Sequence, residues 1–131
     1  MAPRDFCPRA VAVGFMSDVL LTKLFILGLM VVLIDPGSSS QSLIERIRPE
    51  FLERFCTAWG IFFTGLGGFI AGRLNPRVSL GSGLLVGVLS LAASVLFFDW
   101  NLQSVSPDCF YAGVFLTLPA AVTGSRLARC C

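Results

Sequence analysis

Four long apolar stretches constrain this chain more than any other feature of its sequence. A bilayer core is about 30 Å thick, so a helix that crosses it needs about 20 apolar residues. The stretches cover residues 10–34, 49–74, 78–100 and 109–127. Only helices and closed barrels satisfy every backbone polar group in hydrocarbon. Because the stretches are continuously apolar and do not alternate, they predict helices.

Composition supports the same fold class. Hydrophobic residues make up 55% of the 131 residues and charged residues 14%, whereas soluble domains have about 25% charged residues. An ordinary soluble domain and a disordered chain are therefore excluded, and a net charge of +2 is too small for a nucleic-acid binder. We predict a single all-α domain over residues 1–131, an integral membrane four-helix transmembrane bundle in contact with lipids.

Arginines near the ends of the stretches predict the orientation. With four spans, the two termini and the second link lie on one side of the membrane. That side holds six arginines, namely Arg4, Arg9, Arg73, Arg77, Arg126 and Arg129. The opposite side holds three, namely Arg46, Arg48 and Arg54. Because basic residues are enriched on the cytoplasmic side, this predicts a multi-pass protein with both termini in the cytoplasm.

The first link contains a short segment with apolar residues at near-helical spacing. Leu43, Ile44, Ile47 and Phe51 recur on one side of the segment. This pattern suits either a short interfacial helix over about residues 41–48 or an ordinary solvated turn.

Small residues at four-residue spacing mark three of the predicted helices. Such residues let two helix backbones approach closely in a membrane. The candidate packing positions are Gly60, Thr64, Gly68 and Gly72 in the second helix, Gly83 and Gly87 in the third, and Gly113, Thr117 and Ala121 in the fourth. These stripes either pack inside the bundle or form an intermolecular interface.

Asp18 and Lys23 are the two deep charges of the first stretch. At 1.5 Å per residue, Asp18 lies about 12 Å into the stretch and Lys23 about 20 Å. A charge at the centre of a bilayer costs about 2.5–3.5 kcal/mol on insertion scales. Thr22 is one turn after Asp18 and positioned to donate to its carboxylate. Lys23 is about 140° around the helix from Asp18, so the two cannot form an ordinary pair, and each needs its own partner.

Two interpretations of this polar set stay open. Asp18, Thr22 and Lys23 either contribute to a proton or ion relay, or they are buried polar groups that fix helix register or a subunit contact.

No residue pattern predicts catalysis. The chain has no histidine, the commonest general base and metal ligand, so we expect no enzyme activity, no metal and no cofactor. The five cysteines form no C-x-x-C motif, and sequence leaves open whether Cys56 and Cys109 pair. The terminal Cys130-Cys131 is either a lipidated tail or a pair of free thiols.

Two motifs are similar to those of small four-helix bacterial membrane proteins of uncharacterised function. The segment from Gly14 to Thr22 resembles their G-F-x-x-D-x-x-x-T pattern. The segment from Gly67 to Arg73, followed by a glycine-rich helix, resembles their G-G-x-x-A-x-R pattern. Lys23 departs from the pattern, where a small or apolar residue is expected. The resemblance implies four spans in a bacterial inner membrane, and it implies no activity.

These observations lead to two functional hypotheses. The first is a non-catalytic accessory or structural subunit that packs in a larger membrane protein complex or as a homo-oligomer, because the small-residue stripes favour close helix contacts. The second is a small oligomeric channel or transporter that uses Asp18 and Lys23.

Overall fold

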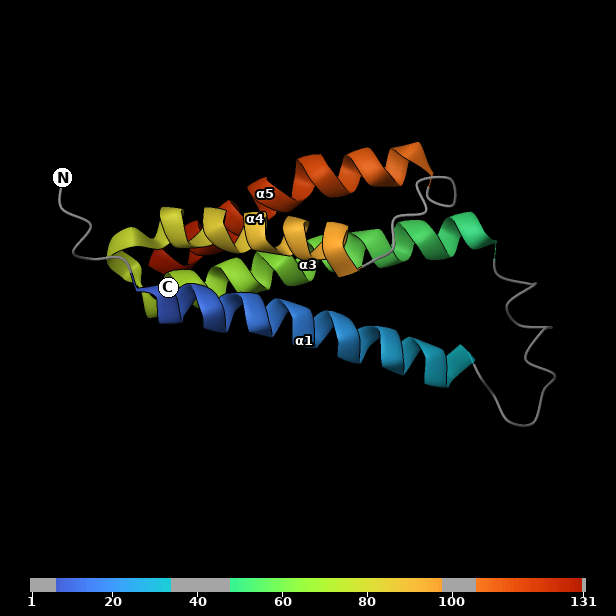
Figure 1. Ribbon diagram of the computed structural model, residues 1–131, viewed down its shortest axis with the longest axis horizontal. Coiled ribbons are helices and arrows are strands. Elements are labelled where there is room, and N and C mark those ends of the chain that lie inside the picture. Colours follow the sequence, from blue (N-terminus) through green and yellow to red (C-terminus); the bar gives the residue numbers. More distant parts are fainter. Residues whose placement is uncertain (1–6, 34–47, 98–105, 131) are drawn as a thin grey trace.

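The computed structural model describes residues 7–33, 48–97 and 106–130, which form four α-helices and one short 3-10 helix (Figure 1). No strand occurs in these three ranges, so the all-α prediction is confirmed. The elements are α1 (Pro8–Leu33), α3 (Pro49–Leu74), η1 (Pro76–Val78), α4 (Ser79–Phe97) and α5 (Pro107–Cys130).

Prolines mark most of the helix boundaries. Pro8, Pro49 and Pro107 each open a helix, where the missing proline N–H leaves no hydrogen bond unmade. α3 ends at Leu74, and Pro76 diverts the chain into η1 because its ring is incompatible with a continuing helix. α4 ends at Phe97, and the rest of the expected stretch to residue 100 lies outside the described residues, as does nearly all of the expected interfacial helix at 41–48.

Consecutive helices run in opposite directions, with α3 and α4 at the centre of the bundle (Figure 1). α1 packs against both of them on one side, and α5 packs against both on the other. The start of α1, the end of α3, the start of α4 and the end of α5 therefore meet at one end of the molecule.

The interior consists of small and hydroxyl-bearing side chains. Ala71, Val86, Ser79, Ser82 and Ser125 are fully buried. Large apolar side chains face outward instead, at positions that include Met16, Leu20, Leu27, Leu96 and Phe115. This is the reverse of a soluble protein, in which large apolar residues are the ones most often buried.

Two of the four helices are long and apolar enough to cross a membrane. They are Pro8–Val32, with a mean hydropathy of 2.0, and Pro49–Leu74, with 1.4. α4 contributes a shorter apolar segment, Ser79–Ser94.

The closest helix contact is the crossing of α3 and α5. A Cβ atom placed on Gly68 would clash with the backbone oxygen of Ala121, and one on Gly124 would clash with the backbone oxygen of Gly65. One turn on, a Cβ atom on Gly72 would lie 2.9 Å from the Ser125 Cα atom. Backbone thus lies directly against backbone, which only small residues permit.

α1 is close to α3 at one end and diverges from it toward the other (Figure 1). Near its start, a Cβ atom on Gly14 would lie 2.6 Å from the Gly67 backbone oxygen. Further along, large rings separate the helices: Phe25 stacks on Trp59 with ring centroids 5.2 Å apart and also contacts Phe55 and Phe63. Residue size along the contact therefore sets the angle between α1 and α3.

Glu53 links the start of α3 to the start of α5. Its Oε1 atom accepts hydrogen bonds from the Ser106 backbone N–H at 2.7 Å and from the Ser106 hydroxyl at 3.1 Å. Ser106 in turn accepts the backbone N–H of Phe110 in the first turn of α5. A carboxylate at this position also suits the positive end of the α5 dipole.

Candidate functional site

Asp18 is the centre of a buried polar cluster that joins three helices. Only 4% of the residue is exposed. The Thr64 hydroxyl of α3 lies 3.1 Å from the Asp18 Oδ2 atom, and the Ser90 hydroxyl of α4 donates to the same oxygen. Thr22, one turn along α1, adds a further side-chain hydrogen bond to the carboxyl group, as the sequence suggested.

The three helices bring these groups to the same depth. Asp18 is about 15 Å from the start of α1, Thr64 about 15 Å from the end of α3, and Ser90 about 16 Å from the start of α4, at 1.5 Å per residue. Because those three helix ends meet at one end of the molecule, the side chains lie in one layer near the middle of the bundle.

Glycines on α1 and α3 bring the short aspartate side chain into reach. A Cβ atom on Gly67 would lie 2.7 Å from the Gly14 backbone oxygen and 3.1 Å from the Asp18 Cβ atom. The reciprocal approach at Gly14 leaves the two backbones in contact one turn before Asp18. A larger residue at either position would push the carboxylate away from Thr64.

The chemistry of the cluster is that of a satisfied acceptor. An ionised carboxylate only accepts hydrogen bonds, whereas each hydroxyl supplies a single donor proton. The Thr64 hydroxyl also lies 3.1 Å from the Gly60 backbone oxygen, and Ser94 donates to the Ser90 backbone oxygen. The single Thr64 proton has two acceptors in reach, the carboxylate and the Gly60 oxygen, whereas Ser90 donates to the carboxylate. These contacts hold α1 against α3 and α4.

Lys23 lies on the opposite, outer surface of α1. It is exposed, and the structure brings it into no contact with Asp18. Lys23 belongs to an otherwise apolar outer stripe of α1 whose members are all exposed. The exposed fraction of each of its four large apolar residues is 55% or more. This α1 stripe consists of Met16, Leu20, Lys23, Leu27 and Met30. Its alternating spacing of four and three residues is that of a helix–helix seam.

The predicted small-residue positions fall into two groups. Gly68, Gly72, Gly83, Gly87 and Ala121 lie in helix contacts, and Thr64 and Thr117 are buried. A Cβ atom on Gly60 or Gly113, in contrast, would meet no atom within 4 Å. The stripes therefore pack within the bundle near its middle and near the end where α1 begins and α5 ends. At the other end their small residues contact no neighbouring helix.

Several residues of these contacts were not singled out from the sequence. Ser90 and Gly124 belong to none of the predicted packing positions, and Gly65 and Gly67 lie one residue from Thr64 and Gly68 of the predicted stripe. The depth of Ser90 along its helix, which matches that of Asp18, is the signal that could have identified it.

The cysteines form no disulfide among the described positions. Cys7, Cys56, Cys109 and Cys130 are free, and of these Cys109 is buried and Cys130 exposed. The pairing of Cys56 with Cys109 that the sequence left open is therefore not formed. Cys131 lies outside the described residues.

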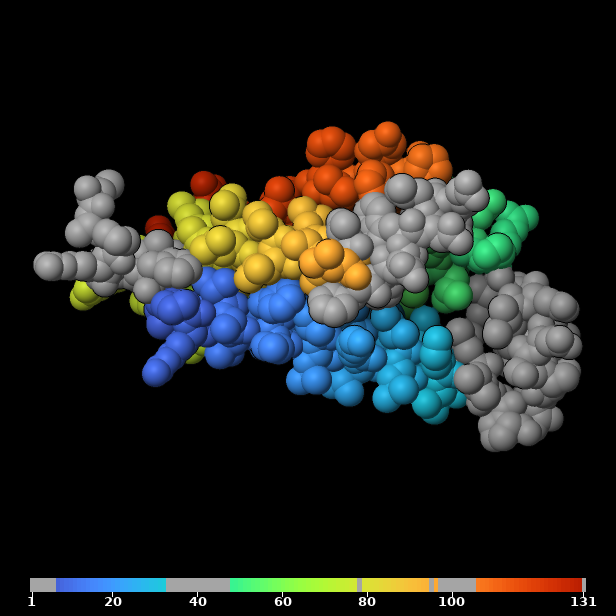
Figure 2. All heavy atoms as spheres, viewed as in Figure 1, coloured from blue at the N-terminus to red at the C-terminus, as the bar shows by residue number. Residues whose placement is uncertain are grey.

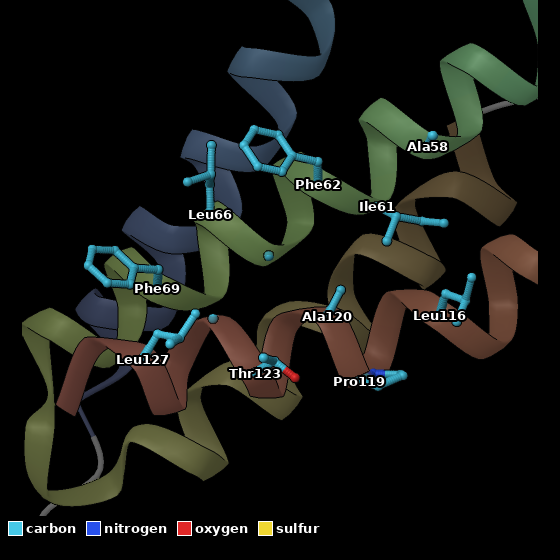
Figure 3. Close-up of a pocket in the computed structure, with 12 residues that line it drawn as sticks. Ala58, Ile61, Phe62, Leu66, Phe69, Leu116, Pro119, Ala120, Thr123 and Leu127 are labelled. Atoms are coloured by element: carbon cyan, nitrogen blue, oxygen red, sulfur yellow. The ribbon is translucent and has the colours of Figure 1, made fainter. Parts of the chain in front are cut away.

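An apolar groove of about 570 Å³ follows the outer side of the α3–α5 crossing (Figure 3). Phe62, Leu66 and Phe69 form its α3 wall, and Leu116 and Leu127 contribute to its α5 wall. The lining also includes four small residues, namely Ala58, Gly65, Ala120 and Gly124, and the two helices touch at Gly65 and Gly124.

No protein-family model, curated protein or solved structure matches this chain in sequence or fold comparisons.

Proposed function

We propose that this chain is a non-catalytic accessory subunit of a bacterial inner-membrane complex, with four spans and both termini in the cytoplasm. It docks on a partner membrane protein through the α1 stripe. The observation that carries the proposal is the position of Lys23, a single charge at the centre of an exposed apolar helix face.

The distribution of side chains supports insertion of all four helices. Small residues and hydroxyls fill the interior, as in membrane bundles, where packing and interhelical hydrogen bonds drive association. Large apolar residues cover the outside of α1, α4 and α5 alike. Such a surface suits lipid, because a soluble monomer rarely exposes contiguous apolar patches larger than a few hundred Å².

Charges at the two ends of the bundle support the orientation. The described residues at one end include five arginines, namely Arg9, Arg73, Arg77, Arg126 and Arg129. The other end carries Arg48, Glu50, Glu53, Arg54 and Asp108. Since cytoplasmic ends are the ones enriched in Arg and Lys, the arginine-rich end with both termini faces the cytoplasm.

Reporter fusions test this topology. A fusion after Cys131 is expected to report the cytoplasm, and one inserted at Ser39 the opposite side, because an odd number of spans separates them. The protein is also expected to stay in the membrane pellet through alkaline carbonate extraction. Extraction into the supernatant, or both fusions reporting the same side, would contradict the four-span model.

Lys23 supports docking because its position in lipid is costly. It lies about 22 Å from the start of α1 and about 15 Å from its end, too deep for its side chain to reach either surface. Left in lipid, the charge costs about 2.5–3.5 kcal/mol. A facing helix removes this cost if it covers the stripe and places an acidic side chain opposite the ammonium group.

The stripe is continuous enough to bury such a helix. From Met16 to Met30 it extends about 21 Å along α1, and the side chains of α1 form one edge of the molecule that no other described helix covers in this view (Figure 2). A single lysine in an otherwise apolar seam specifies the register of the two helices.

The partner is expected to be a different chain. Of the described acidic residues, Asp18 is buried, and Glu50, Glu53 and Asp108 lie in the first turns of α3 and α5 at the far end of the bundle. None of these lies exposed at the depth of Lys23, so the described residues of a second copy would not supply the complementary charge.

Charge reversal tests the docking. When it is purified from native membranes in mild detergent, the wild type is expected to co-migrate with its partner. Lys23→Glu is expected to lower the amount of co-migrating partner at least about tenfold, because it breaks a buried charge pair. A photo-crosslinker at Leu20 or Leu27 identifies the facing helix, with a crosslinker at Leu89 on α4 as the control. Lysine in place of the acidic residue found there is expected to restore co-migration of Lys23→Glu.

Two results would overturn the docking proposal. One is equal partner recovery for wild type, Lys23→Arg and Lys23→Glu. The other is a wild type that migrates as a lone small oligomer, which would favour the channel hypothesis instead.

A further inference from the structure

The groove between α3 and α5 has the shape and charge of a lipid-binding site. We infer that it binds one acyl chain of an anionic phospholipid from the cytoplasmic leaflet, with the phosphate group held between Arg73 and Arg126. This inference rests on the proposed membrane insertion and is independent of the docking face on α1.

The groove begins near the arginine-rich end of the bundle and extends past its middle. Along α3 the lining runs from Phe69, about 8 Å from the end of the helix, to Ala58, about 24 Å from it. The Asp18 layer lies about 15 Å from the same end. An acyl chain that enters from the cytoplasmic side therefore occupies the groove from Phe69 to the middle of the membrane, within one leaflet of about 15 Å.

The lining fits an alkyl chain better than a helix. The α3 and α5 backbones touch at Gly65 and Gly124, so the floor is closed, and large side chains such as Phe62, Phe69 and Leu127 rise on both sides (Figure 3). Thr123 is the one lining residue with a polar side chain. A slot of this form admits a narrow flexible chain between its walls.

Arginines stand at the cytoplasmic mouth of the groove. Arg73 follows Phe69 by one turn on the same wall of α3, and Arg126 follows Thr123 by one turn on α5. Both arginines are exposed. Guanidinium groups bind phosphate through paired N–H donors, and basic residues at this level of a bundle bind anionic headgroups.

The same arginines disfavour a second copy in the groove. Two copies in the same orientation would bring their arginine-rich ends together, and like charges in contact are repulsive. An anionic lipid neutralises those charges instead.

The test compares two lipids that share acyl chains, dioleoyl phosphatidylglycerol and dioleoyl phosphatidylcholine. The full chain is purified from membranes, exchanged into detergent with equal amounts of both, and the retained lipid is counted by native mass spectrometry. The wild type is expected to retain phosphatidylglycerol preferentially. Arg73→Gln and Arg126→Gln are each expected to lower that preference about fivefold, whereas Arg9→Gln, at the same end but on α1, leaves it unchanged.

A second pair of variants tests the groove itself. Thr123→Trp places a large ring on an exposed lining position and is expected to abolish retention of both lipids. Ala92→Trp places the same ring on an exposed position of α4 and is expected to retain them. Because both positions are exposed, neither ring intrudes on the interior, and thermal stability in detergent checks that both variants fold.

Four results would overturn the inference. The first is equal retention of the two lipids by the wild type, and the second is a loss of preference in Arg9→Gln equal to that in Arg73→Gln and Arg126→Gln. The third is full lipid retention in Thr123→Trp. The fourth is that the groove is occupied by an acyl group attached to Cys130, which hydroxylamine would release. If the protein stays in the membrane through carbonate extraction and gives any of these results, only the lipid-site inference is overturned. If carbonate extracts the protein, the proposed membrane function is overturned as well.

Discussion

Gly68→Ala is expected to separate α3 from α5 and to destabilise the whole bundle. The added Cβ atom would clash with the Ala121 backbone oxygen, and backbone atoms cannot rotate away as a side chain does. Overpacking of a closed contact costs about 1–3 kcal/mol and occasionally more. We expect at least about 3 kcal/mol here, because α3 contacts all three other helices. Gly68→Leu is expected to prevent folding.

Gly60→Ala is the matched control for this prediction. Gly60 lies on the same helix, two turns earlier, and a Cβ atom there meets nothing within 4 Å. The same glycine-to-alanine change is therefore expected to be neutral or slightly stabilising, since alanine is the better helix former. The measurement is the unfolding free energy in mixed micelles. Equal losses for the two variants would mean that helix propensity, and not the close approach of α5, determines the effect.

These two glycines also show what spacing alone can predict. Four-residue spacing places Gly60, Thr64, Gly68 and Gly72 on one side of α3, because side chains one turn apart lie above one another. Where that side meets a neighbour depends on the crossing angle, which the residues of both helices set together. The sequence therefore predicted the packing side of α3, whereas the extent of the α3–α5 contact required the structure.

The helices themselves were predictable for a different reason. Their apolar stretches are long and end at prolines or charges, such as Pro49 and the Asn75-Pro76 pair, and these signals act locally along the chain. The partners of Asp18 involve long-range contacts. Thr64 and Ser90 follow it by 46 and 72 positions, yet all three lie about 15 Å from the same end of the bundle. Matching depths across antiparallel helices would have found them.

The position of Lys23 shows the remaining limit. Its angle around the helix from Asp18 was predictable from the helical period, and this excluded a direct pair. Whether it faced the bundle or the outside depended on which side of α1 met α3, and that was determined by Gly14 and its counterpart Gly67.

Asp18→Ala is expected to lower the unfolding free energy by about 3 kcal/mol. The change removes the acceptor for buried hydroxyls on α3 and α4, and each unsatisfied buried group costs about 1–3 kcal/mol. Asp18→Asn is expected to cost less, because its amide oxygen still accepts from Thr64 and Ser90. Ser17→Ala, which removes only an exposed hydroxyl bonded to the Val13 backbone oxygen, is the control and is expected to be near neutral.

Combining Asp18→Ala with Lys23→Met distinguishes a structural carboxylate from one member of an ion pair. A direct pair would make the double variant more stable than the sum of the single losses predicts, because neither charge is left alone. The structure has the two side chains on different surfaces of α1, so we expect the losses to add within about 0.5 kcal/mol. Lys23→Met alone is expected to leave the stability of the isolated chain unchanged.

Flux measurements with the same variants address the relay hypothesis directly. Because the hydroxyls of Thr64 and Ser90 hold Asp18 against α3 and α4, we expect liposomes containing the wild type to show no proton or cation flux above empty vesicles. A wild-type flux that Asp18→Asn abolishes while the variant remains folded would contradict this expectation. It would assign Asp18 to a pathway. A carboxylate that only fixes helix positions can be replaced by a neutral amide that maintains the same fold without any loss of flux.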